Sequence, residues 1–237
     1  MPQRIGVMGG TFDPVHLGHL RVAEETVEAL SLDVLLFVPA AFPPHKVGKK
    51  ILAFKHRWQM LRAATEKHPR FQVSDLEQRR SGKSYTVLTL RELSRAAGDR
   101  AELYFVVGLD AFLDLDTWWH FAELFELAQM VVLRRSGFDE EEMRRFLMER
   151  VSPLYSYSTG DGCFKHPHLL PVRYLRNTWL DISSTQIRHL VKTGNSIRYL
   201  VVPEVVEYIY SNRLYQGDEL LEAEITPSNE CVEWRTG

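Results

Sequence analysis

Two histidines three residues apart, His16 and His19, follow a glycine pair near the start of the chain. Gly9 and Gly10 come directly after the apolar residues of a predicted strand, and apolar residues at spacings of three and four begin beyond Pro14. The pattern predicts a strand that breaks at the glycine turn, followed by a helix. The N-terminus of such a helix offers backbone N–H groups and a positive dipole end to an anion. Two imidazoles at this position suit phosphate chemistry.

Each part of this stretch also has a simpler interpretation. A glycine pair after a strand is often only a tight turn, and a single histidine is more often structural than catalytic. A metal site at His16 and His19 lacks a third ligand at a characteristic spacing nearby. The combination of strand, glycine turn, helix start and paired histidines is much rarer than its parts, so we favour a functional site.

Length and composition limit the class of protein. A chain of 237 residues with 45% hydrophobic and 25% charged residues is typical of a globular protein of one large or two small domains. The formal net charge of −2 gives no overall basic character of the kind that nucleic-acid binding favours. Two cysteines make no disulfide framework, and we find neither an apolar signal segment nor a membrane-spanning run. A cytoplasmic location is therefore expected.

Short apolar runs alternate with helical patterns along the chain, which predicts a parallel sheet with crossover helices. The expected strands after the first lie at 34–38, 71–76, 103–107 and 130–133. A further helix has Phe54, Trp58, Leu61 and Thr65 on one face, and we expect its charges, which include Arg57, to be solvated. A closing helix is expected from Pro203.

Gly82-Lys83-Ser84 ends like a phosphate-binding P-loop, but Glu77 stands where that motif needs a glycine. We reject the P-loop and expect Ser84-Tyr85-Thr86 to open a helix that runs to about Ala97 and is closed by Gly98.

Several acidic residues follow the strand at 103–107. Asp110 stands just beyond its carboxyl end, where ligands bind in open α/β sheets. We expect Asp114 and Asp116 to cap short helices instead of forming a metal site with Asp110. Farther along, Cys163, His166 and His168 could contribute to a zinc site, but no fourth ligand is evident, so we favour a surface loop there.

The stretch GGTFDPVHLGH, residues 9–19, resembles the signature of the nucleotidylyltransferase family, and its longer form with Thr11 to Pro14 resembles the bacterial nicotinate-nucleotide adenylyltransferases in particular. Further motifs of this family follow in its order: PPHK, SYT, glycine-any-aspartate at 108–110, Trp118 and ISST-any-IR at 182–188. Ser136 departs from the family, which usually has a proline there. The resemblance covers about residues 5–215 and is weakest between 139 and 171.

The resemblance implies a Rossmann-like α/β fold, a doubly wound parallel sheet with a small C-terminal helical part. We expect one domain over 1–215 with a variable insert at 139–168, and a tail at 216–237. The implied reaction moves the adenylyl group of ATP onto nicotinate mononucleotide, giving deamido-NAD and pyrophosphate. Mg²⁺ would accompany ATP. ATP and nicotinate mononucleotide are the expected partners, without nucleic acid or membrane; a homo-oligomer stays open, because the sequence does not reveal the oligomeric state.

The resemblance also implies roles for individual residues. The expected catalytic residues are His16, His19, Lys46 and Arg188. The expected ATP-binding residues are Gly9, Gly10, Thr11, Phe12, His16, His19, Arg134, Ile182, Ser183, Ser184, Thr185 and Arg188. The expected substrate-binding residues are Asp13, His45, Lys46, Tyr85, Thr86, Gly108, Asp110, Trp118 and Trp119, and no metal held by the protein itself is expected.

Two other functions stay open at this point. Other members of the superfamily, which transfer nucleotidyl groups to nicotinamide mononucleotide, to phosphopantetheine or from CTP, share the histidine signature. In a different class, the chain could be a nucleotide sensor without turnover. The presence of His16, His19 and Arg188 argues against that second interpretation.

Overall fold

The structure is a computed structural model that describes residues 2–43, 50–134 and 140–217. The strands are β1 (Gln3–Gly10), β2 (Val34–Pro39), β3 (Phe71–Val73), β4 (Ala101–Gly108), β5 (Gln129–Leu133), β6 (Ser156–Ser158), β7 (Cys163–Lys165) and β8 (Val172–Leu175). The α-helices are α1 (Leu17–Leu30), α2 (Phe54–Thr65), α3 (Leu76–Arg79), α4 (Thr86–Ala97), α5 (Leu109–Leu113), α6 (Leu124–Leu127), α7 (Glu140–Phe146), α8 (Ser184–Lys192) and α9 (Pro203–Ser211). Short 3₁₀ turns lie at Gly98–Arg100, Leu115–Thr117 and Phe121–Glu123, and a π-helical turn at Leu147–Val151 follows α7.

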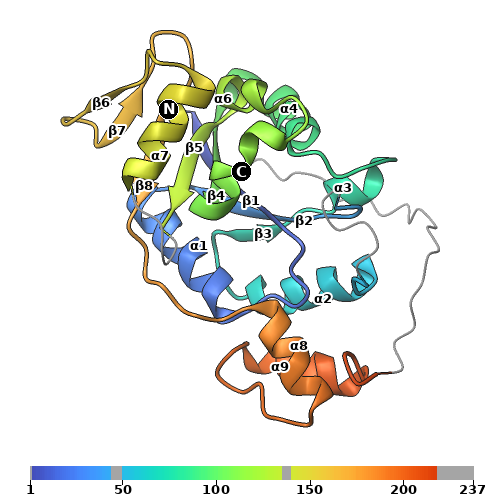
Figure 1. The fold of residues 1–237 in the computed structure, drawn as a ribbon. Helices are drawn as coiled ribbons and strands as arrows, with labels where there is room; N and C mark the ends of the chain where they lie inside the picture. Colours follow the sequence, from blue (N-terminus) through green and yellow to red (C-terminus); the bar gives the residue numbers. More distant parts are fainter. Residues whose placement is uncertain (1, 44–49, 135–139, 218–237) are drawn as a thin grey trace.

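The described strands form one sheet in the order β3-β2-β1-β4-β5-β8-β7-β6 (Figure 1). The six strands from β3 to β8 pair in parallel, and Val7 of β1 lies between Leu36 of β2 and Phe105 of β4. The chain winds outward in one direction from β1 to β3 and in the other from β4 to β8. The strand order therefore reverses between β1 and β4, which is where open α/β sheets bind ligands. The predicted doubly wound sheet is confirmed.

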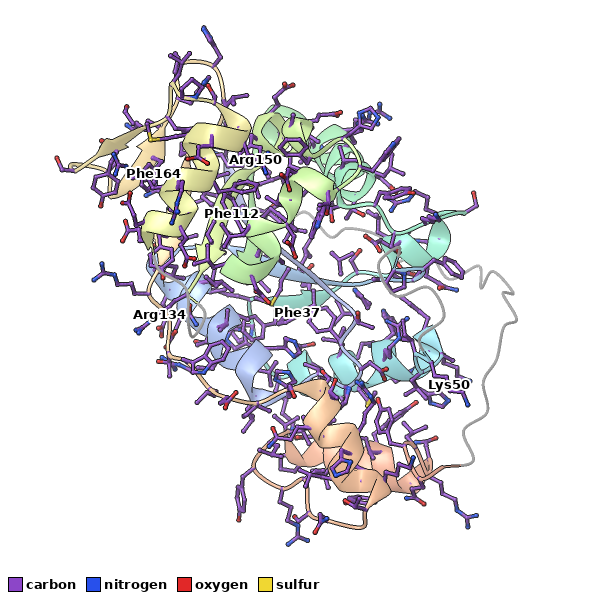
Figure 2. The ribbon with its side chains drawn as sticks, viewed as in Figure 1. Phe37, Lys50, Phe112, Arg134, Arg150 and Phe164 are labelled. Carbon is purple, nitrogen blue, oxygen red and sulfur yellow. The ribbon has the colours of Figure 1, made fainter. Side chains whose placement is uncertain are left out.

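Helices cover both faces of the sheet, because its central strands are apolar on both sides. Alternate residues of each strand enter two different cores, as Val7 and Met8 of β1 do. One core packs against α4 to α7 and includes Phe112, and the other packs against α1, α2, α8 and α9 and includes Phe37. Figure 2 shows these two phenylalanines on opposite sides of the sheet.

Most predicted elements are present, with shifted ends. Helix α4 begins at Thr86 and is closed by Gly98, as expected from the S-Y-T pattern. The first strand continues through Gly10 instead of breaking at the glycine pair, because Gly9 and Gly10 still pair with β2. Strand β3 is shorter than predicted, since Leu76 already begins α3.

The segment between α7 and β8 is not the surface loop that we expected. Residues 156–158 and 163–165 form the antiparallel hairpin β6–β7, which extends the sheet beyond β8 through the pair Phe164 and Val172. Phe164 and Cys163 are buried, and burial of these residues explains why the hairpin packs against the sheet. His166 bonds to Ser152 Oγ at 2.9 Å.

The expected capping roles of the two acids are confirmed only in part. Asp114 occupies the cap position between α5 and the turn Leu115–Thr117, although its side chain makes no cap hydrogen bond. Asp116 lies inside that turn and pairs with Arg150 at 3.5 Å. Of the helices in the described ranges, none is both long and apolar enough to cross a membrane.

Candidate active site

A cavity of about 530 Å³ opens at the carboxyl ends of β1 and β4, where the strand order reverses. Met8 to Gly10 of β1 and Phe105 to Gly108 of β4 form its floor. The neighbouring strands contribute Val38 and Leu133. The predicted site residues that line it are Gly9, Gly10, Thr11, His16, His19, Tyr85, Thr86, Gly108, Trp118, Trp119, Arg134, Ile182, Ser183 and Ser184.

His16 and His19 lie together at the start of α1. Their ring centroids are 3.7 Å apart with the planes nearly parallel, and the backbone N–H of His16 donates to Nδ1 of His19 at 3.3 Å. Because Nδ1 of His19 accepts this bond, the neutral ring carries its proton on Nε2. His16 is buried and His19 is half-buried, and both line the cavity. The pair is therefore held rigidly beside the positive end of the helix dipole.

Two glycines make room for the rings of this turn. A Cβ on Gly18 would lie 3.0 Å from Nδ1 of His16, and a Cβ on Gly10 would lie 2.8 Å from Cζ of Phe12. Phe12 has a φ of 50°, a left-handed conformation that is uncommon for a residue with a Cβ. Its ring is buried, edge-on to His19 at 5.1 Å and to Phe37 at 5.8 Å. Phe12 thus supports His19 from behind.

Two further helices begin at the same cavity. Ser183 caps α8 by accepting the backbone N–H of Gln186 at 3.2 Å. The hydroxyl of Ser184 donates to the carbonyl of Pro14 at 2.8 Å, which fixes α8 against the turn before α1. Helix α4 has no side-chain hydrogen bond at its cap, Tyr85. The N–H of Leu88 donates to the carbonyl of Tyr85 at 3.0 Å, whereas Thr86 and Val87, the first two residues of the helix, line the cavity with N–H groups that have no acceptor within the helix.

Aromatic side chains form one wall. Tyr85 and Trp119 are tilted against each other at 4.9 Å, and Trp118 lies edge-on to Phe105 at 6.5 Å. Trp119 is 44% exposed, whereas Trp118 is half-buried. An aromatic ring in the cavity can stack on such a wall.

Five predicted site residues do not line the cavity: Phe12, Asp13, Asp110, Thr185 and Arg188. The carboxylate of Asp13 is 4% exposed and accepts the hydroxyl of Tyr215 at 2.7 Å. Arg188 donates to the carbonyl of Asp13 at 2.6 Å and to Thr185 at 3.1 Å. The other two are Phe12, described above, and Asp110, which is exposed on the first turn of α5. His45 and Lys46 lie outside the described residues.

Sequence reasoning missed some residues of the site. Arg57 is 2% exposed, not solvated as expected, because the buried face of α2 is shifted and includes Met60 and Leu61. The spacing of three and four between these residues was the signal that could have placed Arg57 inside. Arg57 does not line the cavity but bonds to the carbonyl of Thr11, which does. Glu77 and Asn177, both buried, line the cavity directly, and no pattern in the sequence marks them as site residues.

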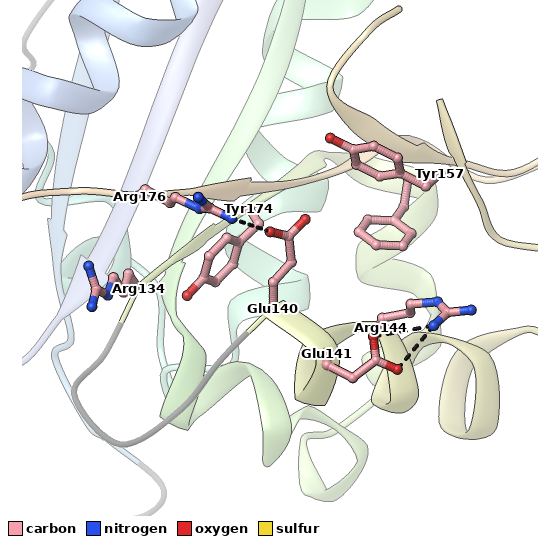
Figure 3. Close-up of a pocket in the computed structure, with 8 residues that line it drawn as sticks. Arg134, Glu140, Glu141, Arg144, Tyr157, Tyr174 and Arg176 are labelled. Carbon is pink, nitrogen blue, oxygen red and sulfur yellow. Dashed lines mark hydrogen bonds and ion pairs between the residues drawn. The ribbon is translucent and has the colours of Figure 1, made fainter. Parts of the chain in front are cut away.

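A second cavity of about 610 Å³ lies between α7 and the strands β7 and β8 (Figure 3). Arg176 and Glu140 pair across it at 3.3 Å, and Arg144 pairs with Glu141 at 3.0 Å. Of the predicted site residues only Arg134 lines it, and Arg134 also lines the first cavity. The first cavity is smaller, but it has the histidines and the three helix N-termini, so we take it as the site.

The described residues contain no group of three or more His, Cys, Asp or Glu side chains placed to hold a metal ion. Arg134 and the N-termini of α1, α4 and α8 bring positive charge to the cavity.

Comparison with known proteins identifies the family of the chain. The family described as Cytidylyltransferase-like matches residues 7–190. A protein of Syntrophotalea carbinolica named "Probable nicotinate-nucleotide adenylyltransferase" is 44% identical over 216 residues, which cover 91% of this chain and 99% of that protein. A protein of Geobacter metallireducens with the same name is 43% identical with the same coverage. The chain belongs to the nicotinate-nucleotide adenylyltransferase branch of the cytidylyltransferase-like family.

A solved structure shows the same fold at lower identity. The nicotinic acid mononucleotide adenylyltransferase of Plasmodium falciparum, in complex with NaAD, superposes with a TM-score of 0.69 at 19% identity, covering 94% of this chain and all of that chain. A second structure of the Plasmodium enzyme, in complex with APC, gives a TM-score of 0.66. The Rossmann-like arrangement predicted from the sequence is thus confirmed.

Proposed function

We propose that the protein transfers the adenylyl group of ATP to the phosphate of nicotinate mononucleotide, producing deamido-NAD and pyrophosphate, as a step of NAD biosynthesis. The family to which the chain belongs supports this reaction. In the structure, the proposal rests on three helices, α1, α4 and α8, whose N-termini all lie at one cavity. Such a cavity suits a ligand with several phosphates although the net charge of the chain is −2.

The reaction requires one bond to form and one to break. A phosphate oxygen of the mononucleotide forms a bond to the α-phosphorus of ATP, and the bond from that phosphorus to the oxygen that bridges to the β-phosphate breaks. The electron pair leaves with pyrophosphate. Because the attacking phosphate is already anionic, the protein need not remove a proton from it. The protein's task is to align two anions that repel each other and to stabilise the charge that develops on the leaving group.

We assign to His16 and His19 the role of stabilising the negative charge that develops on the leaving pyrophosphate. The Nε2–H of His19 is a donor, and the stacked ring of His16 lies beside it at the α1 N-terminus. Ser183 and Ser184 bring the N-terminus of α8 to the same cavity, and Arg134 adds a full positive charge. Mg²⁺ enters with ATP as part of the substrate and neutralises phosphate charge.

Arg188 acts through the turn before α1 in this proposal. Its guanidinium holds the carbonyl of Asp13 and lies 3.9 Å from the Asp13 carboxylate, and its side chain is 34% exposed. It therefore orients the turn at residues 10–14 between β1 and α1, which we call the signature turn. The exposed part of the Arg188 side chain can approach the phosphates.

The test measures pyrophosphate release with ATP, Mg²⁺ and a panel of acceptors: nicotinate mononucleotide, nicotinamide mononucleotide and phosphopantetheine, with CTP replacing ATP in a parallel series. Release that is fastest with ATP and nicotinate mononucleotide supports the proposal. Faster release with another pair would reassign the substrate. ATP binding by calorimetry without any pyrophosphate release would instead indicate a nucleotide sensor.

A further inference from the structure

The carbonyl groups of the signature turn are held by donors from other parts of the chain. The bonds are Ala40 N to Gly10 O at 2.8 Å, Arg57 Nη1 to Thr11 O at 2.8 Å, Arg188 Nη1 to Asp13 O at 2.6 Å and Ser184 Oγ to Pro14 O at 2.8 Å. A carbonyl oxygen that faced a phosphate would repel it, so an anion site needs these oxygens turned toward the protein. Arg57 lies on α2, and Ser184 and Arg188 lie on α8, two helices that pack on the same face of the sheet.

Arg57 is the most buried of these donors. Its side chain is 2% exposed, and its Nε also donates to the carbonyl of Leu52 at 2.8 Å. The C=O of Thr11 and the N–H of Phe12 belong to one planar trans peptide and point in opposite directions. By holding the Thr11 oxygen, Arg57 therefore also sets the direction of the Phe12 N–H.

A buried guanidinium needs compensating charge nearby. Arg57 and Asp13 are joined through Leu52, whose carbonyl accepts from Nε of Arg57 and whose N–H donates to the Asp13 carboxylate. Burial lowers the pKa of Arg57, and the charge of Asp13 opposes that effect. The Asp13 carboxylate is fixed in turn by the hydroxyl of Tyr215 at 2.7 Å and the backbone N–H of Leu52 at 3.4 Å. These contacts join the turn, α2 and the segment after α9.

The backbone of Phe12 gives a reason for this support. Its left-handed conformation persists only where the surroundings hold it, and the Thr11–Phe12 peptide held by Arg57 lies immediately before it. Thr11 lines the cavity and the Phe12 ring contacts His19. A change at Arg57 would therefore reach both the peptide beside the phosphates and the catalytic histidine.

We propose that Arg57 is a positioning residue for adenylyl transfer, which orients the Thr11–Phe12 peptide toward the developing charge, and that Tyr215 supports it by holding Asp13, which is joined to Arg57 through Leu52. This inference rests on the proposed function and extends it to two residues that do not touch the substrates. Misorientation of a donor acts mainly when charge develops in the transition state, so turnover should fall more than affinity.

The first test uses Arg57→Ala and chemical rescue. We expect kcat to fall about 10- to 100-fold, a size typical of small misplacements near the reacting atoms, with each KM within about threefold of wild type. Low concentrations of guanidinium, a planar cation of the lost shape, should restore part of kcat. Equal concentrations of urea, which is planar but neutral, should not. Arg62→Ala is the matched control, because Arg62 lies exposed on the same helix and stacks over Trp58.

Tyr215→Phe keeps the inference testable if Arg57→Ala does not fold. It removes one hydroxyl, and we expect kcat to fall about 3- to 10-fold without a change in KM, with Tyr210→Phe on the exposed side of α9 as control. The inference would be overturned if a folded Tyr215→Phe variant had the kcat of the wild type. It would also be overturned if guanidinium did not restore any activity to Arg57→Ala. If the wild-type protein released no pyrophosphate, the proposed function itself would be overturned. Binding of an ATP analogue is measured for both variants, because unaltered binding shows that a variant is folded and that its loss of kcat concerns the positioning role alone.

Discussion

The rings of His16 and His19 are stacked at 3.7 Å, and Nδ1 of His19 accepts the backbone N–H of His16. The two histidines thus form one unit in which each ring limits the orientation of the other. Substituting either one should disturb the geometry of both.

Substitution of either histidine should therefore lower turnover strongly. For His16→Ala and His19→Ala we expect kcat to fall about 10²- to 10³-fold, the cost of one lost donor to developing charge, while the affinity for the mononucleotide changes little. Steady-state kinetics and calorimetric titration separate the two quantities. If both variants kept turnover within a few-fold of wild type, the histidines would be structural.

Gly18 offers a way to move the His16 ring without removing it. Alanine in a helix is usually more stable than glycine by about 0.5–1 kcal/mol, but here its Cβ would lie 3.0 Å from Nδ1 of His16 and the ring must shift. We expect Gly18→Ala to lower kcat about tenfold while the free energy of unfolding changes by less than about 1 kcal/mol. Gly160→Ala is the control, because open space surrounds that glycine. Unchanged turnover in Gly18→Ala would mean that the ring position does not limit the reaction.

The enzyme should prefer nicotinate mononucleotide to its amide. The N-terminus of α4 has no side-chain cap, and its first two residues, Thr86 and Val87, line the same cavity as Trp118 and Trp119. A carboxylate can accept from the N–H groups of Thr86 and Val87, whereas the NH₂ of a carboxamide leaves one without a partner. Losing one charge-assisted hydrogen bond costs roughly 1.5–3 kcal/mol, which predicts about a 10- to 150-fold preference in kcat/KM.

The role of Trp118 can be separated from this preference. Stacking does not distinguish a carboxylate from a carboxamide, so Trp118→Ala should weaken both substrates and keep most of the ratio. Equal use of both mononucleotides by the wild type would show that the cavity has no acid specificity.

Glu25 makes part of the stability depend on pH. Partial burial would raise the pKa of its carboxyl, but hydrogen bonds from the hydroxyl and backbone N–H of Thr178, together with Arg21, lower it overall below 4.5. A lowered pKa in the folded state stabilises the protein above the unfolded value, and this stability is lost as pH falls through the folded pKa. The difference in urea midpoint between wild type and Glu25→Gln should be present at pH 7 and shrink below pH 4.5. A difference that stays constant across this range would contradict the assignment.

Local patterns in the sequence predicted the fold class, and the resemblance of short motifs to a family predicted most of the residues that line the cavity. The alternation of apolar runs with helical spacing predicted the parallel sheet, because burial on both faces requires continuous apolar strands. The turn with His16 and His19, the segment at Tyr85 and Thr86, and the cap at Ser183 are short motifs whose chemistry is local. Their common place at the sheet follows from the parallel topology, which brings the carboxyl ends of the strands to one edge.

Only the tertiary structure decided the roles of the residues that act across long distances. Arg57 looked like a surface charge because an arginine on a helix is usually solvated; its spacing from Met60 and Leu61 fits a buried face, but only the packing of α2 showed that the side chain lies inside. The hairpin β6–β7 looked like a loop because its strands have three residues each and gain stability by pairing with β8. Asp13 looked like a ligand contact, yet its carboxylate bonds to Tyr215, 202 residues away. Such contacts depend on how distant segments pack, and no local pattern of side chains encodes them.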